Sequence, residues 1–465
     1  MNIGLYKHIY LIGVGGIGMS ALARYFNAKG KQVCGYDKVQ SNLCIVLESE
    51  GIKIHYNDSI EKIPQYIKDA NCNEILVIYT PAISKKNSIL NYFKDKEFKL
   101  YKRAEVLGLI SKESFTIAVA GTHGKTTTSA ILAHVLNHAG KQSTAFIGGI
   151  SKNYNSNLML AEKGNILIVE ADEFDKSFLQ LQPDIAIITS MNSDHLDIYT
   201  NKQDLNNAFK QFASQIKPNG LLLLEDSITV DFLTPDKGFK LYYSAVNKAD
   251  YSAENIKVED GRMIFDLTVI DIVGNKYEKK QEGLSFVLPG IHNVSNAVAA
   301  LAVARYLGLS SEAVINGLET FKGINRRFDV HINTQELAYI DDYAHHPEEV
   351  KATINAAKLL FPEREITVIF QPHLYSRTKD FAKEFAVSLS LADQLILLDI
   401  FPARELPIEG VNSKMLLNYC TSPKKETCSK KELLKILKLE NLDVLITLGA
   451  GDIGDLAQPI KHMLN

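Results

Sequence analysis

The residues whose types and spacing most clearly suggest chemistry form a glycine-rich turn, GTHGKTT, at 121–127. An apolar segment, FTIAVA at 115–120, precedes the turn, and an amphipathic helical pattern follows it. This context predicts a nucleotide-phosphate loop, because glycines let backbone N–H groups approach phosphates and a helix N-terminus favours negative charge. Lys125 would reach the β- and γ-phosphates, and the Thr126 hydroxyl would join a Mg²⁺ shell. The two glycines stand closer together than in the common phosphate-loop pattern, so a simple glycine turn with an incidental Lys-Thr pair is the alternative.

Carboxylates that could hold the metal of a bound nucleotide follow the next apolar segments. ILIVEAD places Glu170 and Asp172 at the end of a predicted strand, on the edge where open α/β sheets bind ligands. The following strand ends in NSDHLD at 192–197, which contains His195. A histidine at a strand end is often structural, but beside a phosphate loop and Glu170 it is predicted to be a metal ligand.

A second glycine turn, GVGGIG at 13–18, also lies between a predicted strand and a predicted helix. Asp37 follows it where a ribose-binding acid is expected. An NAD-dependent oxidoreductase is one interpretation, but such a turn accepts any pyrophosphate, including that of a UDP-sugar. A similar pattern at 449–454 lies too near the C-terminus to open a dinucleotide fold and indicates close helix–strand packing instead.

Three further segments in the last third of the chain carry arginine, histidine and aspartate near strand ends or helix starts. Alone, each is compatible with a solvated pair or a helix start, but together they favour a shared anion-binding site, since arginine pairs bidentately with phosphate or carboxylate. The segments are GINRRFD with Arg326 and Arg327, IDDYAHHPEEV with Asp341, Asp342, Tyr343, His345 and His346, and QPHLYSRTKD with His373 and Arg377.

Composition narrows the class of protein. The formal net charge of −3 gives no basic field that would favour nucleic acid or an anionic membrane as a partner. The five cysteines have no C-x-x-C spacing, which fits reduced thiols in a cytosol. No signal-peptide pattern is present, and no apolar run approaches the roughly 18 residues of a membrane span. A cytoplasmic protein acting on small molecules is therefore predicted, either as a monomer or as a homodimer.

A chain of 465 residues is too long for one hydrophobic core. Apolar strands alternate with amphipathic helices almost throughout, which predicts an α/β fold. Residues 240–288 differ, because they alternate around an Asp-Gly turn and indicate an antiparallel meander. Three domains are predicted: residues 1–106, 107–324 and 325–465.

The chain resembles the Mur ligase family nearly from end to end. The ordered markers are GVGGIGMS, GTHGKTTT, EADEFDKSF, SDHLD, LPGIHNVSNA, RRFD, DDYAHHPEE, QPHLYSRT and FPARELPIEGV. The resemblance implies a Rossmann-like N-terminal domain that binds a UDP-substrate, a central P-loop ATPase-type domain, and a C-terminal Rossmann-like domain closing over ATP and the amino acid. It also implies ATP-dependent joining of L-alanine to the carboxylate of UDP-N-acetylmuramate through an acyl phosphate, with ATP and Mg²⁺ as cofactors. A sister activity that attaches a ready-made tripeptide to the same acceptor is the nearest alternative.

The resemblance also implies a role for individual residues. ATP would be bound by Gly121, Thr122, His123, Gly124, Lys125, Thr126, Thr127, Asn293, Arg327 and Asp342; Mg²⁺ by Thr126, Glu170 and His195; the UDP-substrate by Gly15, Gly16, Ile17, Gly18 and Asp37; and the amino acid by Tyr343, His345 and Arg377. Lys125, His195, Arg327, His345 and Arg377 would be the catalytic residues. Some family members carry a second arginine where this chain has Leu374, so alanine binding is expected to rest more on His345 and Arg377.

Overall fold

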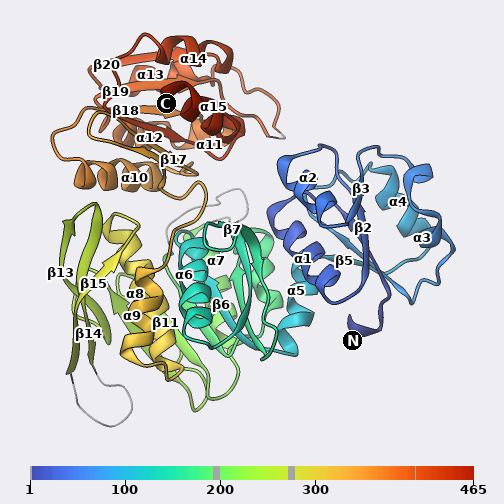
Figure 1. Cartoon of the computed structure of the whole chain (residues 1–465). Helices are drawn as coiled ribbons and strands as arrows, with labels where there is room; N and C mark the ends of the chain where they lie inside the picture. Colours follow the sequence, from blue (N-terminus) through green and yellow to red (C-terminus); the bar gives the residue numbers. More distant parts are fainter. Residues whose placement is uncertain (1–2, 192–198, 200, 271–277, 404) are drawn as a thin grey trace. The chain divides into compact units, whose positions relative to one another are not determined.

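The structure is a computed structural model that describes residues 3–191, 199, 201–270, 278–403 and 405–465. Close contacts divide the chain into two compact units, residues 1–251 with 299–317 and residues 252–298 with 318–465. Within these described residues the strands form three sheets, and Figure 1 follows them from blue through green and yellow to red. The predicted α/β class is confirmed, because most strands are parallel and are followed by helices.

The N-terminal sheet is parallel and has the order β3-β2-β1-β4-β5. Its apolar strands bury both faces, so they need helices on each side. The strands are β1 (His8–Ile12), β2 (Gln32–Tyr36), β3 (Lys53–His55), β4 (Ile75–Tyr79) and β5 (Leu100–Lys102), and the helices are α1 (Ile17–Ala28), α2 (Asn42–Ser49), α3 (Gln65–Asp69), α4 (Ser88–Asp95) and α5 (Arg103–Lys112).

Among the described residues, the central sheet has ten strands in the order β15-β14-β13-β12-β11-β10-β6-β9-β7-β8. The strands are β6 (Phe115–Ala120), β7 (Ser143–Ser151), β8 (Ser156–Met159), β9 (Ile166–Ala171), β10 (Ile185–Ile188), β11 (Leu221–Glu225), β12 (Phe239–Ser244), β13 (Tyr251–Glu259), β14 (Arg262–Ile270) and β15 (Glu278–Phe286). The helices are α6 (Lys125–His138), α7 (Lys202–Ser214), α8 (Ile291–Tyr306) and α9 (Ser311–Glu319), with a 3₁₀ segment, η3, at Phe174–Gln180. β9 and β10 flank β6 in parallel, so the ends of all three strands meet at the phosphate loop.

The antiparallel meander predicted within residues 240–288 is present. β14 and β15 pair antiparallel, and Asp260 and Gly261, between β13 and β14, have φ of 50° and 72°. Two left-handed residues in succession make the tight turn that suits a β-hairpin, and Asp-Gly is a preferred pair there.

The C-terminal sheet has the order β16-β17-β21-β18-β19-β20, with β16 as its antiparallel edge strand. The strands are β16 (Asp329–Asn333), β17 (Ala338–Asp342), β18 (Ile366–Phe370), β19 (Gln394–Leu398), β20 (Lys424–Cys428) and β21 (Val444–Leu448). The helices are α10 (Pro347–Leu360), α11 (Tyr375–Asp380), α12 (Ala382–Leu389), α13 (Ser413–Tyr419), α14 (Lys430–Leu437) and α15 (Ala457–Leu464), with a 3₁₀ turn, η4, at Asp452–Leu456. Within the described part of the chain, no helix is both long and apolar enough to cross a membrane.

Candidate active site

The phosphate loop joins β6 to α6, as the sequence predicts. Gly121 and Gly124 have φ of 135° and 81°, which L-residues with a side chain rarely adopt. A Cβ on Gly121 would stand 2.2 Å from the Thr189 hydroxyl, so no larger residue fits there. The His123 N–H donates to the Ser190 hydroxyl at 2.8 Å, which ties the loop to the end of β10.

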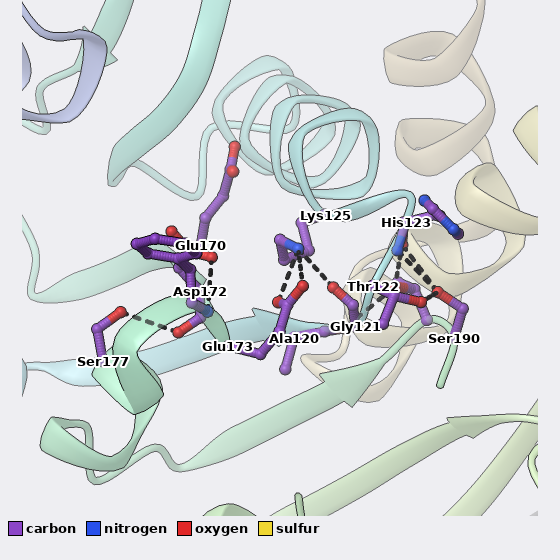
Figure 2. Close-up of polar contacts among 12 residues, drawn as sticks. Ala120, Gly121, Thr122, His123, Lys125, Glu170, Asp172, Glu173, Ser177 and Ser190 are labelled. Atoms are coloured by element: carbon purple, nitrogen blue, oxygen red, sulfur yellow. Dashed lines mark hydrogen bonds and ion pairs between the residues drawn. The ribbon is translucent and has the colours of Figure 1, made fainter. Parts of the chain in front are cut away.

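Lys125, the first residue of α6, points back over the loop (Figure 2). Its ammonium donates to the Gly121 carbonyl at 2.5 Å and to both oxygens of Glu173, at 2.8 and 3.1 Å. Burial alone would lower the pKa of Lys125, but the charges of Glu173 and Asp172 outweigh it, and the pKa is raised. Lys125 is therefore a fully charged group at neutral pH.

Thr126 and Glu170 bring two hard oxygen ligands together beside the loop. The Thr126 hydroxyl donates to the Glu170 carboxylate at 3.1 Å, and the other oxygen of that carboxylate accepts the Gly148 N–H. Gly148 is necessary for this contact, because a Cβ there would lie 2.5 Å from Glu170. A hydroxyl and a carboxylate side by side at a phosphate loop are the donor set that Mg²⁺ uses with nucleotides. The third predicted ligand, His195, lies outside the described residues.

The N-terminal glycine turn is closed by Asp37, from the end of β2. The Gly15 N–H donates to Asp37 at 2.8 Å, and the Val39 N–H donates to its second oxygen at 3.2 Å. Gly16, the N-cap of α1, has open space around it, since a Cβ would find only a carbonyl oxygen at 3.6 Å. The turn thus exposes backbone at a helix N-terminus, which is the geometry that binds a pyrophosphate.

Arg103, which the sequence analysis did not single out, lies against Gly18 in this turn. A Cβ on Gly18 would stand 2.0 Å from its guanidinium, so this glycine leaves room for the arginine. Arg103 also faces Asp172 at 3.7 Å. The only sequence signal was the basic pair that opens α5, and nothing local relates that pair to residue 18.

In the second unit, the two neighbouring arginines and the end of β17 form one cluster. Arg326 donates to Asp341 at 3.0 Å, and the guanidinium groups of Arg326 and Arg327 each lie 5.2 Å from the Tyr343 ring. Asp342 accepts the Phe328 N–H at 2.6 Å and the Ala344 N–H at 2.7 Å. Burial raises its pKa to about 6, although Arg327 and the two N–H groups favour the ionised form.

Two histidines and Arg377 form a neighbouring cluster. The rings of His345 and His373 lie edge to face, 6.0 Å apart. The pKa of each falls to about 4, first because of burial and then because of the charge of Arg377, although Glu349 opposes the shift at His345. The Nη1 of Arg377 is buried and has no hydrogen-bond partner among the described residues. These three side chains therefore present one positive charge and two neutral rings at neutral pH.

Backbone strain marks the start of α11 between His373 and Arg377. Leu374 has φ of 70° and ψ of 137°, which is a sparsely populated conformation for a residue with a side chain. Its N–H donates to the Phe401 carbonyl at 2.9 Å, and this bond holds the strained residue in place. Strain of this kind gathers at functional sites because the surrounding structure must impose it.

Asn293, predicted to face adenine, lies in the first turn of α8. Its side-chain amide donates to the Pro289 carbonyl at 2.8 Å, and the residue is buried. The glycine pattern at 449–454 serves packing, as predicted, because a Cβ on Gly451 would stand 2.4 Å from Gln371 and 2.8 Å from Phe401.

Comparison with known proteins places these features in one family. Family models match residues 8–115 as "Mur ligase family, catalytic domain", residues 119–304 as "Mur ligase middle domain" and residues 326–451 as "Mur ligase, glutamate ligase domain". The chain is 47% identical to a UDP-N-acetylmuramate–L-alanine ligase of Flavobacterium psychrophilum over the full length of both chains. It is 46% identical to the same ligase of Parabacteroides distasonis, over 100% of this chain and 98% of the relative.

Solved structures agree with this placement. The UDP-N-acetylmuramate-alanine ligase of Thermotoga maritima superposes with a TM-score of 0.80 at 29% identity, covering 98% of this chain and 99% of that one. A murein peptide ligase from Psychrobacter arcticus has a TM-score of 0.70 at 23% identity, covering 98% of each chain, and shows the shared fold.

Proposed function

Because the chain belongs to the Mur ligase family, an ATP-dependent family of ligases, we propose that it joins L-alanine to the carboxylate of UDP-N-acetylmuramate during peptidoglycan precursor synthesis. The observation that carries this proposal is the end-to-end identity of 47% to a ligase of that name. It is supported by the glycine loop, where Lys125 and Thr126 lie beside the carboxylates of Glu173 and Glu170. The relatives that are 42–47% identical are named alanine ligases, which favours alanine over a tripeptide as the second substrate. They equally favour ligation over the hydride transfer of an NAD-dependent enzyme.

The reaction needs ATP because a carboxylate is a poor electrophile. Transfer of the γ-phosphoryl group to the muramoyl carboxylate gives an acyl phosphate, which the amine of L-alanine attacks, and phosphate leaves. Most of the catalysis in such a reaction comes from positioning and charge neutralisation. Lys125 and the N–H groups of residues 121–127 would hold the phosphates.

Thr126 and Glu170, with His195 as a third ligand, would hold Mg²⁺. A bound Mg²⁺ ion supplies positive charge against the transferring phosphoryl group. Arg327 would neutralise charge at the nucleotide phosphates, while Asn293 and Asp342 would contact adenine and the ribose.

Binding of the two other substrates divides between the remaining clusters. Gly15, Gly16, Ile17 and Gly18 would hold the UDP pyrophosphate, and Asp37 would fix both the turn and the nucleotide ribose. Tyr343, His345 and Arg377 would hold the amino acid. The Nη1 of Arg377, which has no hydrogen-bond partner among the described residues, suits the alanine carboxylate, and the neutral His345 does not repel the alanine amine.

Phosphate release from ATP and Mg²⁺ with UDP-N-acetylmuramate tests the proposal, comparing L-alanine with L-Ala-γ-D-Glu-meso-diaminopimelate. We expect turnover that depends on L-alanine and a product heavier by one alanyl residue. Turnover only with the tripeptide would reassign the protein to the tripeptide-joining activity. Turnover with neither would refute both.

A further inference from the structure

Glu173, three residues beyond Glu170, is a fully buried carboxylate that the proposed reaction does not use. Its exposed fraction is 0%, and both oxygens accept from the Lys125 ammonium. Figure 2 shows the Lys125 ammonium facing the Glu173 carboxylate, beside the Gly121 carbonyl. A buried charge is tolerated only when it is paired, so each group holds the other in this arrangement.

The backbone around Glu173 is fixed by contacts of its own. The buried Tyr199 hydroxyl donates to the Glu173 carbonyl at 2.8 Å. Asp175 and Lys176, two and three residues further along the chain, both have left-handed backbone; Asp175 pairs with Lys102 at 2.8 Å and Lys176 with Asp204 at 3.2 Å. Two consecutive strained residues are held by ion pairs on either side, so the carboxylate has little freedom to move away from Lys125.

The charges around the loop determine which form of a nucleotide it favours. Lys125 contributes one positive charge, and Glu173, Glu170 and Asp172 are the carboxylates that act on it. Asp172 also faces Arg103. A polyphosphate arriving without a divalent cation would meet an ammonium that Glu173 already neutralises. The same polyphosphate with its cation would bring positive charge to Glu170. The Lys125 ammonium would then contact both a phosphate oxygen and the Glu173 carboxylate.

We infer that Glu173 is a positioning residue that directs Lys125 over the loop and makes nucleotide binding selective for the cation complex. This inference rests on the proposed function, because it presumes that the loop binds ATP and ADP. Glu173 itself would touch neither phosphate nor cation, and it would act through Lys125.

The test measures the dissociation constant of ADP by calorimetry on the full chain, once with Mg²⁺ and once with EDTA. For Glu173→Gln, we expect ADP binding in EDTA to strengthen about tenfold, since one opposing charge is removed, while binding with Mg²⁺ changes much less. The ratio of the dissociation constant in EDTA to the dissociation constant with Mg²⁺ therefore falls about tenfold. Glu173→Asp keeps the charge, so its ratio of the two dissociation constants should stay close to that of the unaltered protein. The exposed Glu162→Gln, with the same change in net charge, should leave both constants unchanged.

A loss of affinity by the same factor in both conditions would overturn the inference, since it would make Glu173 merely structural. Unchanged constants in both conditions would overturn it too. Tyr199→Phe provides a second variant in case Glu173→Gln does not fold: loosening the Glu173 backbone should lower the ratio in the same direction, and an unchanged ratio would contradict the inference. If the unaltered protein bound no ADP even with Mg²⁺, the proposed function itself would fail, and that outcome is distinct from all of these.

Discussion

Arg377 has a buried guanidinium nitrogen that no described group satisfies, and its charge acts on two neighbouring neutral histidines, His345 and His373. If this nitrogen binds the alanine carboxylate, Arg377→Ala should raise the KM for L-alanine about 100-fold, because removing one partner of a buried charge pair costs roughly 3 kcal/mol. Steady-state kinetics at saturating ATP and UDP-N-acetylmuramate would measure this KM. Lys379→Ala removes an exposed cation from the same short helix, α11, and should leave the KM unchanged. An equal effect of both variants would argue against a direct contact.

The half-buried histidines His345 and His373 predict how stability depends on pH. The pKa of His345 is about 4 in the folded chain and about 6.5 when unfolded, so between these values the unfolded state binds the extra proton. Stability is therefore present above pH 6.5 and is lost as the pH falls toward 4. One such histidine costs about 2 kcal/mol on going from pH 7 to pH 5.

His345→Gln tests this dependence, because glutamine has no proton to gain. The loss of unfolding free energy between pH 7 and pH 5, measured in urea, should be about 2 kcal/mol smaller in the variant than in the unaltered protein. His462→Gln, which changes an exposed histidine, is the control. An identical loss in all three proteins would show that the burial of His345 does not govern its ionisation.

At the scale of single elements, a glycine at each end of α1 allows substrate binding and protein stability to be tested separately. Gly16, at the N-cap, has φ of −69° and open space around it, whereas Gly30, beyond the C-terminus, has φ of 73°. Gly16→Ala should change the free energy of unfolding by less than about 1 kcal/mol but weaken UDP-N-acetylmuramate binding at least about tenfold, because its methyl group enters the proposed pyrophosphate space.

Gly30→Ala is the matched substitution at the other end of the helix. It should destabilise the protein by about 1–2 kcal/mol, since alanine is strained at positive φ, and leave substrate affinity unchanged. Calorimetric titration and urea unfolding of both variants measure the two effects. Weakened binding in Gly30→Ala but not in Gly16→Ala would refute the placement of the pyrophosphate.

The elements that the sequence predicted well are those with strong local patterns. The strand before residue 121, the helix after it and the Asp-Gly hairpin each follow from a short stretch of sequence. The pairing of Lys125 with Glu173 spans 48 residues and depends on two left-handed residues after β9, which no local pattern indicates. The contact of Arg103 with Gly18 is also non-local, because it depends on the order of the parallel strands β1, β4 and β5 in the N-terminal sheet.

At the scale of the whole molecule, the family match supports a division of labour along the chain. Three family models follow one another over residues 8–115, 119–304 and 326–451. The predicted borders at residues 106 and 324 remain a prediction, as do the individual ligand contacts. The physical basis of the division is that each glycine turn lies on its own sheet, with its own closing side chain: Asp37 for the first and Lys125 for the second.

Two substitutions, one at each glycine turn, should therefore each weaken the binding of a different ligand. Lys125→Ala should abolish acyl phosphate formation and weaken ADP binding, while UDP-N-acetylmuramate affinity stays within about twofold, because no described residue hydrogen-bonds to both Lys125 and Asp37. Asp37→Asn should weaken UDP-N-acetylmuramate binding about tenfold or more, since it removes the charge that closes the turn, and leave ADP binding intact. Calorimetric titration of each variant with each ligand gives the four constants needed. Joint loss of both affinities in either variant would mean that the two turns act as one coupled site, and binding could then no longer be assigned to separate sheets.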